Sequence, residues 1–185
     1  MDAFLTSTLS VALAEIGDKT QLLSLVLAAR FRNKAAIVAG ILVATLINHA
    51  VSAYLGNWLG QFFQSTLGHW LVGGSFILLG LWLLIPDKDE DVDRRFDQYG
   101  AFVVSTILFF IAEIGDETQI ATVLLGAQFD SVLWVTLGTT LGMLIANVPV
   151  VYAGSYLMQR IPISLVHKLA ALAFAIVGIM HIINA

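Results

Sequence analysis

Cysteine is absent from this chain and charged residues are scarce, and each shortage excludes a class of protein. Without cysteine, the 185-residue chain has neither disulfides nor thiolate ligands for a metal. Only 12% of its residues are charged, whereas a soluble domain has about 25%. No basic patch is present to support nucleic-acid binding. The rest of the composition, 58% hydrophobic with a mean hydropathy of +0.88, is typical of a membrane protein.

Six apolar segments account for most of the chain. Each is close in length to the roughly 20 residues that a helix needs to cross a bilayer. We predict that all six are helices, because an open sheet cannot satisfy its backbone hydrogen bonds in lipid. The expected fold is therefore an all-α membrane protein with six transmembrane helices. They are expected at roughly Ala3–Ala29, Ala35–Leu59, Trp70–Ile85, Ala101–Ala127, Val132–Leu157 and Ser164–Ile183.

The chain contains an internal repeat. The sequence AEIGDKTQ at 14–21 returns as AEIGDETQ at 112–119, an offset of 98 residues. Other identities follow at the same offset without a gap, among them Phe4 with Phe102, Gly40 with Gly138 and His69 with His167. Each half therefore forms a unit of three helices. Because three is odd, the second unit must enter the membrane in the opposite direction, and such inverted repeats are typical of secondary transporters.

A polar segment, PDKDEDVDRRFDQY, separates the halves. We expect a single transport domain, with one three-helix repeat at residues 1–86, an acidic linker at 87–99 and the second repeat at 100–185. The positive-inside rule sets its orientation, because the Lys and Arg residues other than Lys19 all fall on one side of the membrane, with Lys168 at the start of the last span. That side is expected to be cytoplasmic, with the acidic loop inside and both termini outside. These residues are Arg30, Arg32, Lys34, Lys88, Arg94, Arg95, Arg160 and Lys168.

The repeated motif puts carboxylates inside two spans. An Asp at the centre of a membrane helix costs ~2.5–3.5 kcal/mol on insertion scales, so acids there indicate a function. In a continuous helix, Glu15 and Asp18 lie about 60° apart on one face, and Gln21 follows on the same stripe. Between the two acids of each motif stands a glycine, Gly17 or Gly115. Either glycine would allow a close helix approach or a local break.

Where the two motif helices cross, four carboxylates and two amide oxygens would meet. Such an all-oxygen set suits a hard divalent cation such as Mg²⁺, Ca²⁺ or Mn²⁺. Other polar residues near these acids could contribute, although Thr20 and Thr118 point away from the acids in an ideal helix. The expected ligands are Glu15, Asp18, Gln21, Glu113, Asp116 and Gln119, and the secondary candidates are Ser7, Lys19, Thr20, Asn48, His49, Ser105, Glu117, Thr118 and Asn147.

The two motifs differ at one position, where Lys19 in the first half corresponds to Glu117 in the second. Each lies four residues after its motif glutamate, so Lys19 could neutralise Glu15 while Glu117 crowds Glu113. Lys19 could instead pair with Glu117 across the halves. In either case, we expect the two halves of the site to take up protons differently.

The same carboxylates suggest how transport is driven. Clustered acids in a low-dielectric site repel one another, so some should hold protons when no metal is bound. A divalent cation would displace those protons. In a site open to one side at a time, this competition is antiport, and no cofactor is expected. The chain has no GxxxxGK[ST] sequence of the kind that binds ATP.

The motifs E-I-G-D-K-T-Q and E-I-G-D-E-T-Q resemble the doubled E-x-G-D-[KR]-[TS] signature of a family of small cation exchangers. That family includes bacterial MneA-type manganese exporters and the Golgi manganese/calcium transporters of eukaryotes. The resemblance covers essentially the whole chain, and Glu117 departs from it, because the family has Lys or Arg there. It implies that the motif acids bind the cation and that Mn²⁺, or secondly Ca²⁺, is exported in exchange for protons. It also implies a bacterial inner membrane protein, whose partners are the metal and the lipid bilayer, with a homo-oligomer left open.

Three other functions are alternatives. An intramembrane aspartyl protease would need two Asp side chains about 3 Å apart, and the paired glutamates argue against it. A passive divalent cation channel would move ions only down their gradient. An amino-acid exporter would need cationic groups to meet its substrate, and apart from Lys168 at the start of the last span, Lys19 is the only Lys or Arg within the expected spans.

Overall fold

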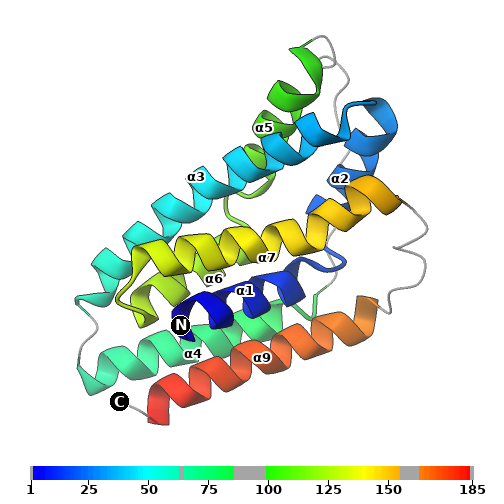
Figure 1. The fold of residues 1–185 in the computed structure, drawn as a ribbon. Coiled ribbons are helices and arrows are strands. Elements are labelled where there is room, and N and C mark those ends of the chain that lie inside the picture. Colours follow the sequence, from blue (N-terminus) through cyan, green and yellow to red (C-terminus); the bar gives the residue numbers. More distant parts are fainter. Residues whose placement is uncertain (1, 63–64, 86–98, 155–162, 184–185) are drawn as a thin grey trace.

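The structure is a computed structural model that describes residues 2–62, 65–85, 99–154 and 163–183. Within these ranges all regular structure is helical and no strand occurs (Figure 1), so the predicted all-α class is confirmed. The predicted acidic linker, apart from Tyr99, lies outside the described residues. The helices are α1 (Asp2–Glu15), α2 (Lys19–Arg30), α3 (Lys34–Gly60), α4 (Thr66–Trp82), α5 (Gly100–Ala112), α6 (Glu117–Gln128), α7 (Val132–Ala153) and α9 (Ile163–Ile183).

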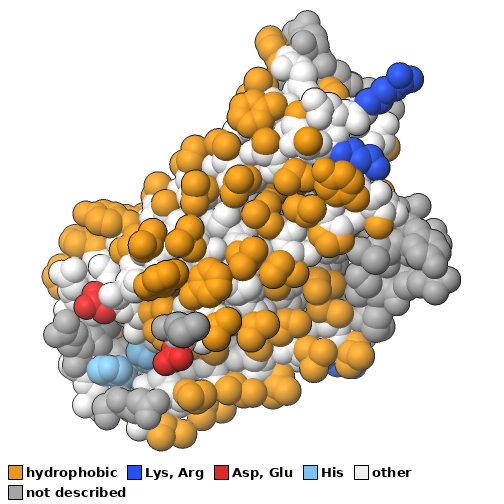
Figure 2. All heavy atoms as spheres, in the orientation of Figure 1, with side chains coloured by type: hydrophobic (Ala, Val, Ile, Leu, Met, Phe, Trp, Pro, Cys, Tyr) orange, Lys and Arg blue, Asp and Glu red, His pale blue; other side chains and the backbone are white. Residues whose placement is uncertain are grey.

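Long apolar helices and an apolar exterior indicate a membrane protein. Among the described residues, α3, α7 and α9 are each long and apolar enough to cross a bilayer, and α4 and α5 are shorter apolar helices. Large apolar side chains stand exposed, such as Leu67 at 70% and Leu78 at 68%. Figure 2 shows hydrophobic side chains over most of the drawn face. A soluble monomer rarely exposes so much apolar surface, and here lipid would cover it.

The first and fourth predicted spans are not continuous helices, which corrects the prediction. The chain leaves the helix after Glu15 and resumes it at Lys19, and the second half does the same between Ala112 and Glu117. The cause is a glycine in the left-handed region, Gly17 at φ 95° and Gly115 at φ 78°. An L-residue with a side chain rarely adopts such a φ, so glycine ends the helix. Of the two roles considered for these glycines, the structure shows the local break.

Helix contacts in the two halves correspond at the repeat offset. Gly138 of α7 lies against Ser7 of α1, and Gly40 of α3 lies against Ser105 of α5. A methyl group at either glycine would come within 3.0 Å of the facing helix, so only glycine permits this approach. Thus α1 packs on α7 as α5 packs on α3.

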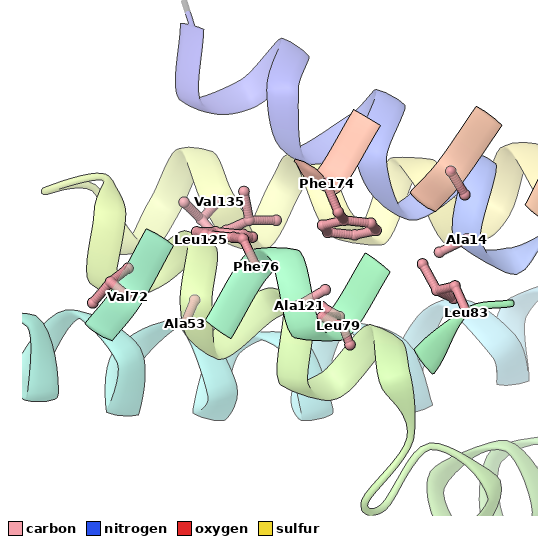
Figure 3. Close-up of a cluster of buried hydrophobic side chains, with 11 residues drawn as sticks. Ala14, Ala53, Val72, Phe76, Leu79, Leu83, Ala121, Leu125, Val135 and Phe174 are labelled. Carbon is pink, nitrogen blue, oxygen red and sulfur yellow. The ribbon is translucent and has the colours of Figure 1, made fainter. Parts of the chain in front are cut away.

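The two remaining helices, α4 and α9, pack side by side along one flank of the other helices. Their contact includes Phe76 and Phe174, whose rings stack with centroids 6.2 Å apart. These rings belong to a buried cluster that also holds Leu125 of α6 and Val135 of α7 (Figure 3). In Figure 1, both ends of the chain lie at the same end of the molecule as the α3–α4 and α6–α7 connections, and the α2–α3 connection lies at the other.

Candidate metal centre

The two helix breaks bring the motif acids to helix ends in the interior of the protein. Glu15 is the last residue of α1, and Asp18 caps α2, where its carboxylate accepts a hydrogen bond from the Thr20 N–H at 3.2 Å. Asp116 occupies the same capping position before α6 but makes no side-chain bond to that helix's N–H groups. Helix N-termini favour nearby negative charge, so each break stabilises an aspartate carboxylate at this depth.

Five carboxylates gather in two groups that share one member. In the first group, Glu15, Glu113 and Asp116 each offer an oxygen within 4.8 Å of the others. In the second, Asp18, Asp116 and Glu117 do the same. All five side chains are buried. The structure therefore brings together the four predicted motif acids from both halves of the chain, and adds Glu117 to them.

Some of these carboxylate oxygens have no hydrogen-bond partner. Glu15 Oε1 and Glu113 Oε1 are buried and accept no bond within the described part of the chain. A buried carboxylate without compensation is costly, because its charge has lost water and gained no donor. A cation or a proton between the two glutamates would remove that cost.

A small cavity adjoins the second group. It measures about 10 Å³ and is lined by Asp18, Asp116, Glu117 and His167, with the end of α4 beside them. That volume holds roughly one water molecule. The carboxylates of the second group therefore border a space of the size that a single dehydrated cation needs.

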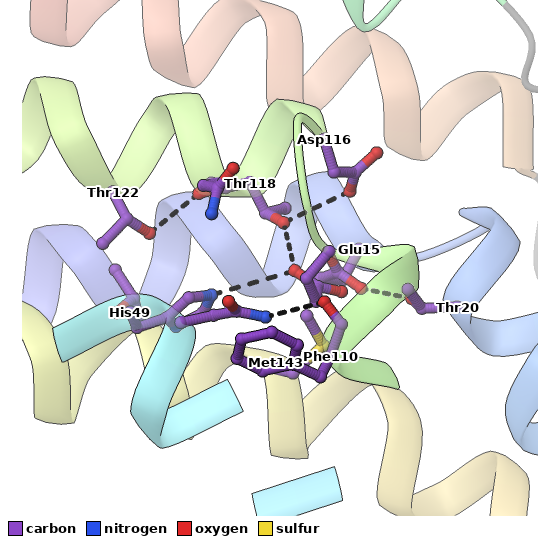
Figure 4. A network of polar contacts seen from close by, with 12 residues as sticks. Glu15, Thr20, His49, Phe110, Asp116, Thr118, Thr122 and Met143 are labelled. Atoms are coloured by element: carbon purple, nitrogen blue, oxygen red, sulfur yellow. Dashed lines mark hydrogen bonds and ion pairs between the residues drawn. The ribbon is translucent and has the colours of Figure 1, made fainter. Parts of the chain in front are cut away.

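The threonines of the motif point toward the acids, contrary to the prediction from an ideal helix. Thr20 donates its hydroxyl to Glu15 Oε2 at 2.5 Å, and Thr118 donates to Glu113 Oε2 at 3.0 Å. Thr118 also lies 3.3 Å from Asp116 Oδ2. The prediction was wrong because it assumed an unbroken helix, and the break turns the first residues of α2 and α6 back over the preceding glutamate. Figure 4 shows these hydroxyls directed into the carboxylate cluster.

The motif glutamines bind the broken backbone. Gln21 Oε1 accepts the Gly17 N–H at 2.9 Å, and Gln119 Oε1 accepts the Gly115 N–H at 2.7 Å. Gln21 also donates its amide N–H to the Ala146 carbonyl of α7 at 2.9 Å. These bonds hold the two breaks in matching conformations. Metal ligation by Gln21 and Gln119 stays a prediction.

Helices α3 and α7 contribute polar groups around the carboxylates. Asn147 donates to Glu15 Oε2 at 3.3 Å, and His49 Nε2 lies 3.9 Å from Glu113 Oε2 with both side chains fully buried. Asn48 instead donates to the Phe110 carbonyl at 3.1 Å. Two further candidates, Ser7 and Ser105, lie in the helix contacts described above. Their hydroxyl groups have no hydrogen-bond partner among the described residues.

Two hydroxyl residues at equivalent positions of the halves were not predicted from the sequence. Ser24 donates to Asn147 Oδ1 at 2.8 Å, which orients the Asn147 amide toward Glu15. Thr122 stands at the equivalent position of the second half and is also buried. The repeat could have indicated them, because the offset aligns two hydroxyl residues one helical turn after the motif glutamines.

A salt bridge joins the two halves at the shared carboxylate. Lys19 Nζ lies 2.7 Å from Asp116 Oδ1, with 26% of the lysine side chain exposed and 2% of the aspartate. Glu15 and Glu117 are the partners of Lys19 expected from the sequence, and this contact adds Asp116. The ammonium therefore contacts the one residue that both carboxylate groups contain.

The family model of the divalent cation/proton antiporter GDT1 matches residues 3–91 and 101–185, which is nearly the whole sequence. The chain belongs to the GDT1 family of divalent cation/proton antiporters. Its members are transporters and not enzymes, which confirms the resemblance drawn from the doubled motif. The protease and channel alternatives receive no support from this match.

Individual relatives agree with the family. A Vibrio cholerae protein named "Putative manganese exporter" is 48% identical over 183 residues, which cover 97% of this chain and 90% of the relative. A GDT1-like protein of Synechocystis is 26% identical over 202 residues, covering 97% and 96%. GDT1-like protein 4 of Oryza sativa subsp. indica is 27% identical over 199 residues, covering 94% and 70%. No solved structure matches the chain significantly.

Proposed function

We propose that this antiporter exports Mn²⁺ in exchange for protons through the carboxylate site between its two helix breaks. The observation that carries the proposal is that five buried acidic residues form two sets of three, and that Asp116 belongs to both sets. Mn²⁺ is a cation that carboxylate and carbonyl oxygens suit. Neither group contains a sulfur or imidazole ligand, which zinc and copper sites commonly use. Ca²⁺ fits the same oxygens, and the name of the Vibrio cholerae relative favours Mn²⁺.

Proton exchange follows from competition for the same oxygens. A metal binds the deprotonated carboxylate, so its arrival releases protons and its departure readmits them. Glu15 Oε1 and Glu113 Oε1 are oxygens on which this competition can take place, because neither has a hydrogen-bond partner among the described residues. In this mechanism the protons held between transport events offset the repulsion of the buried acids.

The proposed architecture is six membrane spans arranged as two inverted repeats. In it, α1 with α2 forms one broken span, α5 with α6 forms another, and α3, α4, α7 and α9 form the other four. Equivalent contacts at Gly40 and Gly138 support the repeat. Broken helices that meet near the midplane are a common way for transporters to build an ion site.

The proposed location is a bacterial inner membrane, with both termini outside. Arg30, Arg32 and Lys34 lie around the α2–α3 connection, at the end opposite the termini in Figure 1. Positive charge at that end supports a cytoplasmic placement. The cavity beside Asp18 and Glu117, lined by His167 near the start of α9, would then open toward the cytoplasm.

The test is ion uptake by liposomes that contain the purified full chain. With an acidic interior, outward proton flow should drive Mn²⁺ to a higher concentration inside than outside, and an ionophore that dissipates the pH gradient should abolish the excess. Mg²⁺, Ca²⁺ and Na⁺ are measured in parallel to rank the substrates. Equilibration without accumulation would indicate a channel, and no divalent cation uptake would overturn the proposal.

Matched variants assign the transport to the site. Asp18→Asn and Asp116→Asn should each lower the Mn²⁺ uptake rate at least tenfold, an effect of the size expected when metal binding is perturbed. Asp2→Asn is the control, because Asp2 lies at the other end of α1, about 20 Å from Glu15 at 1.5 Å per residue. Full activity in both site variants would show that ions cross elsewhere.

A further inference from the structure

A pair of histidines lies at the end of the molecule that carries both termini. His69 stands in the first turn of α4 and His181 in the last turn of α9. Their ring centroids are 5.1 Å apart and their planes are inclined by 33°. The two rings therefore connect the ends of neighbouring antiparallel helices.

One hydrogen bond fixes the ring of His69. Its Nδ1 lies 3.0 Å from the Ser65 carbonyl oxygen. A carbonyl only accepts hydrogen bonds, so Nδ1 carries the proton and the neutral ring keeps its lone pair on Nε2. Metal-binding histidines commonly show this arrangement, in which the other ring nitrogen donates to a backbone carbonyl and fixes the ring.

The histidine pair lines a hollow with further oxygen donors. The hollow has a volume of about 600 Å³, and its lining includes Gln128 and Asp130 with both histidines. The Asp130 carboxylate is held by the Asn57 amide, which donates to it at 3.1 Å. Figure 2 shows histidine and acidic side chains near one another at this end of the drawn face. The acidic side chain makes the hollow attractive to a cation.

Packing between the helices does not require the second histidine. At the repeat offset His69 corresponds to His167, but His181 corresponds to Leu83. Leu83 and His167 both line the small cavity at the other end of these helices. A leucine therefore fits the equivalent position, and the imidazole of His181 adds a nitrogen ligand at one end only.

We propose that His69 and His181 bind a transition-metal ion of the Zn²⁺, Cu²⁺ or Ni²⁺ class and thereby bridge α4 and α9. Imidazole nitrogen suits these ions, while the carboxylate centre suits harder ones. Water completes the coordination shell, and the Asp130 carboxylate in the lining of the same hollow adds negative charge. This site is separate from the carboxylate centre and does not depend on the proposed transport.

Copper titration of the purified full chain tests the site. Cu²⁺ bound by imidazole shows nitrogen hyperfine coupling in its electron paramagnetic resonance spectrum, which carboxylate ligands do not produce. The wild-type protein should bind one Cu²⁺ with this signature, and His181→Leu should weaken that binding at least tenfold. His181→Leu introduces the residue found at the equivalent position, so it should fold, and size-exclusion chromatography verifies this.

Two controls separate this site from the others. His167→Gln removes a histidine at the opposite end and should leave the nitrogen-coupled Cu²⁺ unchanged. Asp116→Asn perturbs the carboxylate centre and should also leave it unchanged, whatever its effect on transport. The proposal is overturned if the wild type gives no nitrogen coupling, or if His69→Gln and His181→Leu both retain the signal at wild-type affinity.

Discussion

Replacing Lys19 by glutamine should strengthen divalent cation binding. The Lys19 ammonium lies 2.7 Å from Asp116 Oδ1. A cation that takes this oxygen as a ligand must first displace the ammonium. Lys19→Gln removes the positive charge and keeps a side chain of similar length. The metal cation then no longer competes with an ammonium for Asp116.

The size of the effect follows from the contact. Unit charges at this distance attract by about 6 kcal/mol at an effective dielectric constant of 20. Water reduces the net value, because 26% of the lysine side chain is exposed. A hydrogen bond to a charged group contributes about 1.5–3 kcal/mol net. At 1.4 kcal/mol per factor of ten, Mn²⁺ affinity should rise roughly 10- to 100-fold.

Mn²⁺ binding can be measured directly, because free aqueous Mn²⁺ gives a paramagnetic resonance signal that is lost on binding. The matched control is Lys168→Gln, which removes the same charge from an exposed position on α9. In liposomes, the KM for Mn²⁺ should fall in Lys19→Gln, and the pH dependence of transport should change. Unchanged or weaker binding in Lys19→Gln, with Lys168→Gln like the wild type, would refute displacement of the ammonium by the cation.

Two further substitutions test how the site is built. Gly115→Ala should destabilise the protein by about 1–2 kcal/mol, because alanine is strained at φ 78°. Thermal unfolding should show the loss, and Gly74→Ala, at a helical glycine with equally open surroundings, should show none. Thr20→Val removes the hydroxyl that binds Glu15 and should cost about 1–3 kcal/mol of folding stability. In the same unfolding assay Thr106→Val is its control, since that hydroxyl donates to a carbonyl of its own helix. Equal losses in the two variants would contradict a special role for Thr20.

The sequence predicted the helical class and the meeting of the motif acids, because both rest on local signals. Apolar segment length indicates helices in lipid, and identical motifs at one offset indicate equivalent positions in two halves. The direction of the Thr20 and Thr118 hydroxyls could not be predicted, because it depends on where each helix breaks. A glycine in sequence is compatible with a helix or a break, and only the backbone conformation at Gly17 and Gly115 decides between them.

Side-chain partners across the two halves were also beyond prediction. Lys19 has several acids within reach, and the contact it makes with Asp116 depends on how α2 and α6 are placed relative to one another. The same holds for the histidine pair, since His69 and His181 belong to opposite halves and meet only because α4 packs on α9. Sequence spacing does not specify which individual side chains pair across the halves.

Asp116 has a consequence for the path of an ion, because it belongs to both carboxylate groups. A cation that moves from Asp18 and Glu117 to Glu15 and Glu113 exchanges two ligands and keeps the third. In the proposed mechanism it would then keep at least one protein oxygen throughout, and the largest desolvation penalty would be avoided. If the proposed mechanism holds, Asp116 would stay bound to the cation while the other ligands exchange, and losing its carboxylate should slow the movement of the ion as well as weaken its binding.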